Sequence, residues 1–136
     1  MKKLFIDTNI VLDLLGQRAP FYQDAAKLFS LADRKEIKLC VSSLSFANAN
    51  YILSKLKSKE EARAILTRFK VLVEVLALDD KILELSLNDD AFSDFEDALQ
   101  YYTALENESD VIITRNLRDF KTSATPVMTA GQYLQK

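Results

Sequence analysis

Short apolar segments alternate with helical stretches along the whole chain, and this alternation restricts the fold more than any other feature. The candidate strands are residues 3–6, 37–41, 71–76, 111–114 and 126–128. Between and after them, apolar residues recur at helical spacing in segments 10–15, 21–34, 44–57, 58–70, 79–87 and 94–106 and in a short stretch that begins at residue 129. Almost wholly apolar strands separated by helices are typical of a parallel sheet that is covered on both faces. We therefore expect an α/β fold: an α/β/α sandwich with a central parallel sheet of four to five strands.

Size and composition fit one domain over residues 1–136. The chain has only two glycines and two prolines, with no linker or repeat. No apolar run approaches the roughly 20 residues of a membrane helix, and the N-terminus lacks a signal-peptide pattern. The single cysteine, Cys40, lies in an apolar segment and cannot form an intrachain disulfide. We expect a cytoplasmic protein with no membrane partner.

The chain contains no histidine, and this narrows its chemistry. Most zinc sites and every serine–histidine or cysteine–histidine arrangement are excluded. Any catalysis must use carboxylates, amides, hydroxyls, lysine, arginine or a metal ion.

Acidic residues stand where the strands of such a sheet would bind a ligand. Asp7 follows the first strand, Asp119 follows the fourth, and Asp94 and Asp97 open the helix before the fourth. Ligands of open parallel sheets bind beyond the carboxyl ends of the strands, where the strand order reverses. Each acid alone could be a helix cap or a first-turn residue. Carboxylates that converge repel one another, so their convergence favours a site for a divalent cation.

Four segments in succession resemble the motifs of the PIN domain, the nuclease fold of VapC-type toxins. They are Ile6-Asp7-Thr8-Asn9, Ser42-Ser43-Leu44-Ser45-Phe46-Ala47-Asn48, Phe95-Glu96-Asp97-Ala98-Leu99 and Thr114-Arg115-Asn116-Leu117-Arg118-Asp119-Phe120. Their order and spacing match the family over essentially the whole chain. The resemblance implies a PIN-like sandwich that binds Mg²⁺ or Mn²⁺ and cleaves single-stranded RNA. It also implies a small antitoxin protein as partner and a homodimer.

The resemblance assigns roles residue by residue. Asp7 and Asp97 match the principal metal-binding aspartates, and Asp119 matches a later acid that often binds metal through water. Polar residues of the motifs, Thr8, Thr114 and Asn116, match positions that orient the cluster.

Asn48 departs from the family pattern, which usually has a glutamate at this position. Asparagine can hold water or phosphate by hydrogen bonds but cannot act as a carboxylate ligand or base. Asp94, three residues before Asp97 on one helical face, could restore the charge. Alternatively, the chain is a weak or inactive PIN-fold module that binds RNA or protein.

Charge is unevenly distributed although the net charge is only −2. Residues 79–110 hold eleven acidic side chains against one lysine, whereas residues 55–70 are rich in cations. Candidates for guiding RNA are Lys55, Lys57, Lys59 and Arg63. The alternative for this segment is a solvated helix face. Three tyrosines, Tyr51, Tyr101 and Tyr102, could stack on unpaired bases, although a surface or core role is the simpler interpretation for each.

A phosphoryl-transfer domain with a nucleophilic aspartate is a second hypothesis. A haloacid-dehalogenase-type phosphatase would need a second acid two residues after Asp7, where this chain has Asn9. A response-regulator receiver would place its acceptor after the third strand and a lysine after the fourth, and no clear lysine occurs there. Metal dependence of RNA cleavage separates these hypotheses.

Overall fold

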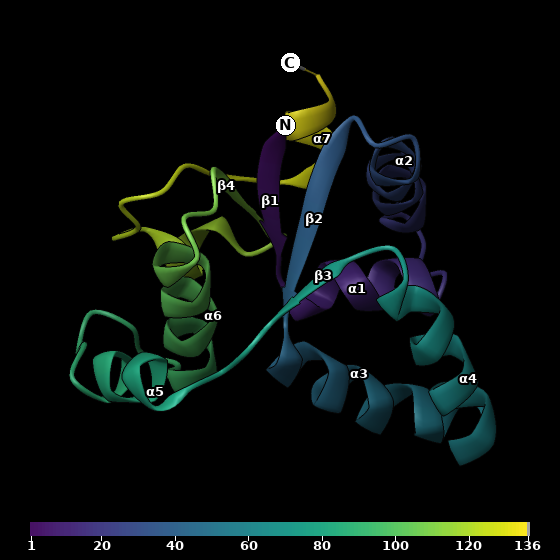
Figure 1. The fold of residues 1–136 in the computed structure, drawn as a ribbon, viewed down its shortest axis with the longest axis horizontal. Helices are drawn as coiled ribbons and strands as arrows, with labels where there is room; N and C mark the ends of the chain where they lie inside the picture. Colours follow the sequence, from purple (N-terminus) through teal and green to yellow (C-terminus); the bar gives the residue numbers. More distant parts are fainter. Residues whose placement is uncertain (136) are drawn as a thin grey trace.

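The computed structural model describes residues 1–135 and contains a five-stranded sheet flanked by helices (Figure 1). The strands are β1 Lys2–Ile6, β2 Ile37–Ser42, β3 Glu74–Leu76, β4 Val111–Ile113 and β5 Val127–Met128. The helices are α1 Thr8–Leu15, α2 Tyr22–Asp33, α3 Ser43–Leu56, α4 Lys59–Lys70, α5 Asp80–Leu87, α6 Phe95–Glu106, the 3₁₀ helix η1 Leu117–Phe120 and α7 Ala130–Leu134.

All strand pairs are parallel, in the order β3-β2-β1-β4-β5, so the predicted parallel sheet is confirmed. The chain moves outward from β1 to β2 and β3 and then returns to place β4 on the other side of β1. The strand order therefore reverses between β1 and β4, where a ligand site is expected.

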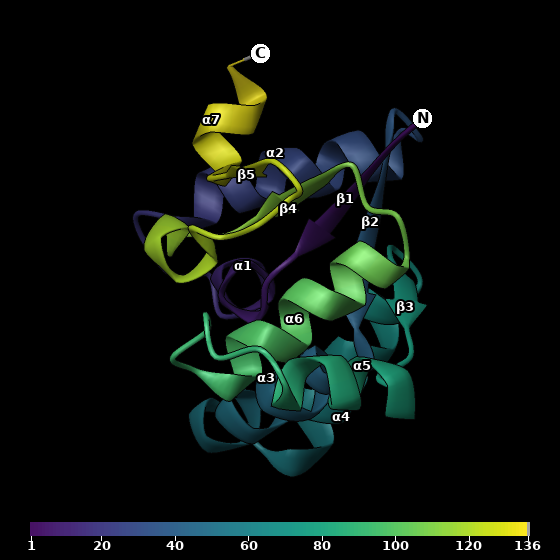
Figure 2. The same cartoon turned by 90° about the vertical axis from the view of Figure 1, so that its left-hand side faces the viewer.

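Alternate residues of the strands enter two separate cores, which makes the molecule a sandwich. Leu4 and Ile6 of β1 join a core with α1, α2, α3, α4 and α7. Phe5, between them, joins a core on the opposite face that includes residues of α6 and η1. This is the period-2 alternation of a strand that is buried on both faces. Figure 2 shows α6 lying across the face of the sheet opposite α2.

The third strand is shorter than predicted. The apolar run 71–76 suggested a strand over its whole length, but β3 contains only Glu74–Leu76. Val71 and Leu72 instead continue the last turn of α4, where their amides donate to Arg68 and Phe69 carbonyls. Val71 is 85 % exposed, so apolar character at this position does not mark burial.

The fold brings the carboxyl ends of β1 and β4 together at one edge of the sheet. The Asp7 amide donates to the Ile113 carbonyl at 3.0 Å, and the Thr114 amide donates to Met128 at 3.0 Å. The residues that follow these strands are thereby held side by side. None of the described helices has the length and apolar character needed to cross a membrane.

Candidate metal centre and catalytic cavity

A cavity of about 420 Å³ opens at this edge of the sheet, and its lining is dominated by acids and amides. It is lined by Asp7, Thr8, Asn9, Leu12, Asn48, Tyr51, Ile52, Asp94, Glu96, Asp97, Gln100, Asn116 and Asp119. Elements α1, α3, α6 and η1 all contribute. The predicted residues Asp7, Asp97 and Asp119 therefore meet in one place, together with Asn48, Asp94 and Asn116.

Asp7 is both a helix cap and a cavity residue. One carboxylate oxygen accepts from the Thr8 amide at 2.8 Å and caps α1. The other accepts from the Thr114 hydroxyl at 2.9 Å. Thr114 also accepts from the Asn116 amide at 3.1 Å, which fixes the turn after β4. The predicted orienting role of Thr114 has this physical basis, although Thr114 itself does not line the cavity.

The N-terminus of α6 supplies three further acids. Asp94 caps this helix by accepting from the Glu96 amide at 2.8 Å. Glu96 and Asp97 follow in the first turn, where the helix dipole favours negative charge. Asp94 lines the cavity as well, so its capping role and its contribution to the cavity charge coexist.

Asn48 contacts an acid that the sequence interpretation left without a role. Its amide nitrogen donates to the Glu96 carboxylate at 3.0 Å and links α3 to α6. The carboxylate that stands next to position 48 is therefore carried by Glu96. The sequence offered one signal for this position of Glu96. It stands next to Asp97 in the first turn of the helix, where it is exposed.

A buried hydroxyl–amide cluster supports the cavity floor. The Thr8 and Ser45 hydroxyls lie 2.7 Å apart, and the Gln100 amide donates to both at 2.9 Å. Gln100 is 3 % exposed and its carbonyl oxygen has no partner among the described residues. The cluster ties α1, α3 and α6 together directly beneath the acids. Neither Ser45 nor Gln100 was predicted, because nothing in their local sequence marks a contact between such distant segments.

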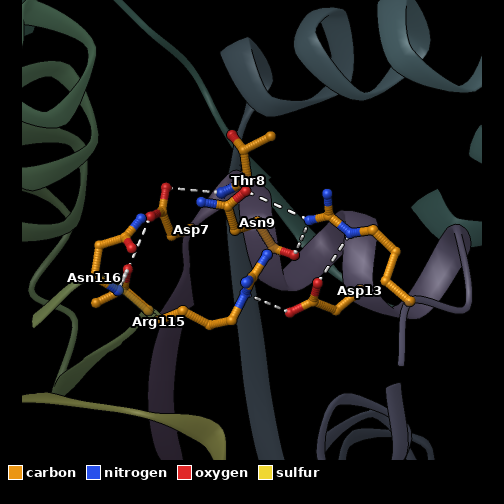
Figure 3. Close-up of polar contacts among 8 residues, drawn as sticks. Asp7, Thr8, Asn9, Asp13, Arg115 and Asn116 are labelled. Carbon is orange, nitrogen blue, oxygen red and sulfur yellow. Dashed lines mark hydrogen bonds and ion pairs between the residues drawn. The ribbon is translucent and has the colours of Figure 1, made fainter. Parts of the chain in front are cut away.

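A second network pairs Arg18 and Arg115 with the buried Asp13. Figure 3 shows the Arg115 side chain extending toward Asp13 and not toward Asp7. Asp13, only 1 % exposed, forms ion pairs with Arg18 at 3.1 Å and with Arg115 at 3.0 Å. Arg115 also lies over the Phe21 ring, 3.9 Å from its centroid. Arg18 reaches the Asn9 carbonyl at 3.2 Å and fixes the start of α1. The sequence signal for this network was Asp13, an acidic residue inside the otherwise apolar segment 10–15.

The acids of the cavity have no cationic partner. Within residues 1–135, no lysine or arginine forms an ion pair with Asp7, Asp94, Glu96, Asp97 or Asp119. Burial raises the pKa of Asp7, with smaller contributions from the negative charges of Asp119 and Glu96 that the Thr114 and Thr8 hydrogen bonds oppose. Burial, and then the neighbouring charges of Asp94, Asp119, Asp7 and Glu96, raises the pKa of Asp97 to about 7.

This charge arrangement fits a small divalent cation held by few protein ligands. No three acidic or cysteine side chains in the described part of the chain lie close enough to form a ready-made metal cage. Mg²⁺ is typically bound through one or two carboxylates and several waters, which an open cavity with dispersed carboxylates permits. All donors present are oxygens, the ligand type that Mg²⁺ and Mn²⁺ prefer.

The raised pKa of Asp97 predicts a pH-dependent stability of the metal-free protein. Because Asp97 binds its proton more tightly when folded, its contribution is fully present below the unfolded pKa of 3.8 and is lost as pH rises from there through the folded pKa of about 7. We expect Asp97→Asn to raise the midpoint of thermal unfolding at pH 8 in EDTA, with a smaller gain at pH 5. The exposed Asp90, outside the cavity, provides the matched control Asp90→Asn. An equal gain in both variants, or no dependence on pH, would contradict the prediction.

The predicted basic residues divide into two groups. Lys55, Lys59 and Arg63 line a separate cavity of about 480 Å³ between α3 and α4. Lys57 is exposed at the end of α3 and is not among the residues that line it.

Known proteins resemble this chain in sequence and in fold. The PIN domain family model matches residues 3–118. Ribonuclease VapC1 of Aquifex aeolicus is 24 % identical over 138 residues, covering 99 % of this chain and 95 % of that protein. The structure of DNA-bound VapBC from Salmonella typhimurium superimposes with a TM-score of 0.71 at 20 % identity, covering 94 % of this chain and 97 % of that chain. A toxin–antitoxin complex from Klebsiella pneumoniae gives a TM-score of 0.70 at 21 % identity, covering 93 % of this chain and 97 % of that chain. With acids at the reversal of strand order and a family match over most of its length, this chain belongs to the PIN domain family.

Proposed function

We propose that the protein is a metal-dependent endoribonuclease that hydrolyses phosphodiester bonds of single-stranded RNA and acts as the toxin of a toxin–antitoxin pair. The observation that carries this proposal is the group of five acids around one cavity, with which no lysine or arginine within residues 1–135 forms an ion pair. The name of the Aquifex aeolicus relative, a ribonuclease, supports RNA as the substrate.

In the proposed mechanism, Asp7 and Asp97 would be the principal residues that hold Mg²⁺ or Mn²⁺, and Asp119 would contribute less directly. When bound, the ion stabilises the charge that develops on the phosphate and activates water for attack on phosphorus. The Thr114 hydroxyl donates to Asp7 and fixes the orientation of its carboxyl group, and the same hydroxyl accepts from the Asn116 amide. Asn48 holds Glu96 at the opposite wall, where this carboxylate can orient the attacking water. The attack breaks one phosphorus–oxygen ester bond of the RNA.

The experiment that tests the function compares RNA and DNA oligonucleotides with matched sequences. Single-stranded and hairpin forms of each are incubated with the protein in Mg²⁺, Mn²⁺ or EDTA, and the products are resolved by gel electrophoresis. We expect cleavage within single-stranded RNA in either metal and none in EDTA. Cleavage that persists in EDTA would contradict the metal mechanism, and cleavage of DNA alone would contradict the substrate.

Asn48 itself favours one second candidate, a PIN-fold module with weak or no catalysis. The usual family carboxylate is absent at this position, and the Asn48 amide instead donates to Glu96. For this candidate, Mg²⁺ would raise the midpoint of thermal unfolding while no RNA in the panel is cleaved.

Asn48→Glu is expected to tighten Mg²⁺ binding about tenfold, because metal affinity in such sites rises with the number of ligand charges. In EDTA the same variant should unfold at a lower temperature than wild type, since a second carboxylate would face Glu96. Titration calorimetry and thermal unfolding measure the two effects. Asn48→Gln has the same length as the glutamate variant without its charge, and equal behaviour of the two would contradict the prediction.

The proposed partners are a small antitoxin protein and a second copy of the chain. The VapBC and toxin–antitoxin complexes from Salmonella typhimurium and Klebsiella pneumoniae support a partner of this kind. The exposed apolar side chains Ile52 and Leu56 on α3 offer surface for one. Co-expression with a short protein encoded beside this gene should suppress RNA cleavage, and light scattering of the isolated protein should give the mass of a dimer.

A further inference from the structure

The cavity between α3 and α4 has the composition of a phosphate site. Of its six lining residues, Lys55, Lys59 and Arg63 are cationic and none is acidic. Asn50 and Ser54 add hydrogen-bonding groups from α3. The cavity therefore presents positive charge and polar groups to a ligand.

The three cations are free to bind an anion. Lys59 and Arg63 stand one turn apart on α4, so their side chains lie on one face of that helix. Within the described part of the chain, none of the three forms an ion pair with an acid. Their charges are thus not neutralised by the protein itself.

Tyr51 connects this cavity to the acidic one. It lines both cavities and is 62 % exposed. The Lys55 ammonium lies 2.7 Å from the Tyr51 hydroxyl and 4.2 Å from the ring centroid, so Lys55 packs against this ring. An exposed aromatic face next to cations is the combination that binds single-stranded nucleic acids.

The two cavities are separated by a distance that fits one substrate strand. Asn48 at the acidic cavity and Lys55 at the basic one are seven residues apart on α3, or about 10 Å along the helix. A strand with a phosphate at the acids can therefore reach the cations with a neighbouring nucleotide.

We propose that the α3–α4 cavity binds a phosphate group of single-stranded RNA next to the scissile bond, with a base stacked on Tyr51. This inference rests on the proposed ribonuclease function and adds the subsite that positions its substrate. An acidic segment of a protein partner would also match the positive charge. The shared aromatic side chain and the continuity with the acidic cavity favour the nucleic acid.

The test measures binding of a fluorescein-labelled octauridine by fluorescence anisotropy in Mg²⁺, with Asp97→Asn present in every protein to prevent cleavage. The variant Lys59→Gln/Arg63→Gln removes two charges from the cavity. Its matched control, Arg68→Gln/Lys70→Gln, removes two exposed charges from the other end of α4, outside the cavity. Tyr51→Ala and Tyr51→Phe separate the aromatic ring from the hydroxyl.

We expect the Lys59/Arg63 variant to bind octauridine about tenfold more weakly at 0.1 M salt and with a flatter salt dependence. The control pair should change the affinity less than twofold. Tyr51→Ala should weaken binding by about tenfold, while Tyr51→Phe retains most of it. Equal weakening by both pairs, or none by either, would overturn the proposal.

Two further outcomes separate this inference from the proposed function. If wild type binds RNA through the basic cavity but cleaves none in either metal, the ribonuclease fails and the binding site stands. If wild type cleaves RNA and the Lys59/Arg63 variant shows unchanged KM and kcat, the ribonuclease stands and the subsite fails. A polyglutamate peptide serves as the probe for an acidic protein partner. If the cavity binds this peptide and the variants leave the affinity for octauridine unchanged, the cavity is assigned to a protein partner and the proposal is wrong.

Discussion

Asp7→Asn and Asp97→Asn are each expected to lower RNA cleavage by at least about a thousandfold, because a catalytic metal supplies several kcal/mol of transition-state stabilisation. Both substitutions keep the size of the side chain while they remove an anionic ligand. The Asn side chain at position 7 can keep the Thr8 amide bond on its carbonyl oxygen, and its NH2 group can donate to the Thr114 hydroxyl instead of accepting from it, so the fold should persist. Steady-state rates in saturating Mg²⁺ measure the effect.

The matched control for this loss is again Asp90→Asn, an exposed acid outside the cavity. It should retain wild-type rates. Circular dichroism and thermal unfolding should show that the two cavity variants are folded. If either variant keeps more than a tenth of the wild-type activity while folded, that aspartate is not a principal ligand. Asp119→Asn should cause a smaller loss, since Asp119 is exposed and is proposed to contribute less directly.

Among single substitutions of the charged residues described above, Asp13→Ala should lower the free energy of unfolding the most. Removing a buried acid leaves Arg18 and Arg115 without their shared partner, which typically costs about 3 kcal/mol in the free energy of unfolding. The lower end of the usual range applies because both arginines are about one-third exposed and regain some hydration. Urea unfolding with two-state analysis measures the loss.

An exposed ion pair in the same molecule provides the control for Asp13. Arg34 and Glu36 lie 2.8 Å apart, but their side chains are 62 % and 55 % exposed. Glu36→Ala should therefore cost less than about 1 kcal/mol. In a double-mutant cycle, Asp13→Ala and Arg115→Gln should be clearly non-additive. A loss below about 1 kcal/mol for Asp13→Ala, or simple additivity, would show that the network does not stabilise the fold.

The Asp13 network also explains how the acidic cavity keeps its charge. Arg115 belongs to the turn after β4, directly beside Asn116 of the cavity. A free arginine at that place would neutralise the nearby carboxylates and compete with a metal ion. Its ion pair with Asp13 and its contact with the Phe21 ring hold the guanidinium. Figure 3 shows the Arg115 side chain directed toward Asp13 and away from Asp7.

Local sequence was sufficient for the type and order of most elements. Leu4 and Ile6 alternate with Phe5 so that β1 fills two cores, and such a strand reads as a continuous apolar run. Ser42, Ser58 and Thr129 cap the helices that were expected after them, because a capping hydrogen bond spans only two or three residues. The prediction from local sequence was wrong at Val71, which was expected in a strand. This apolar side chain follows a helix and faces solvent.

The sequence by itself therefore determined the parallel sheet, the edge at which the acidic cavity opens and the acids Asp7 and Asp97 that line it. Only the tertiary structure decided which carboxylate stands beside Asn48, where Arg115 is directed and which cations face the α3–α4 cavity. The physical reason is the range of the interactions. The Asn48–Glu96 and Thr114–Asp7 hydrogen bonds join residues 48 and 107 positions apart. Such contacts depend on how α3, α6 and β4 are placed by the packing of the whole core, which no short segment of the chain encodes.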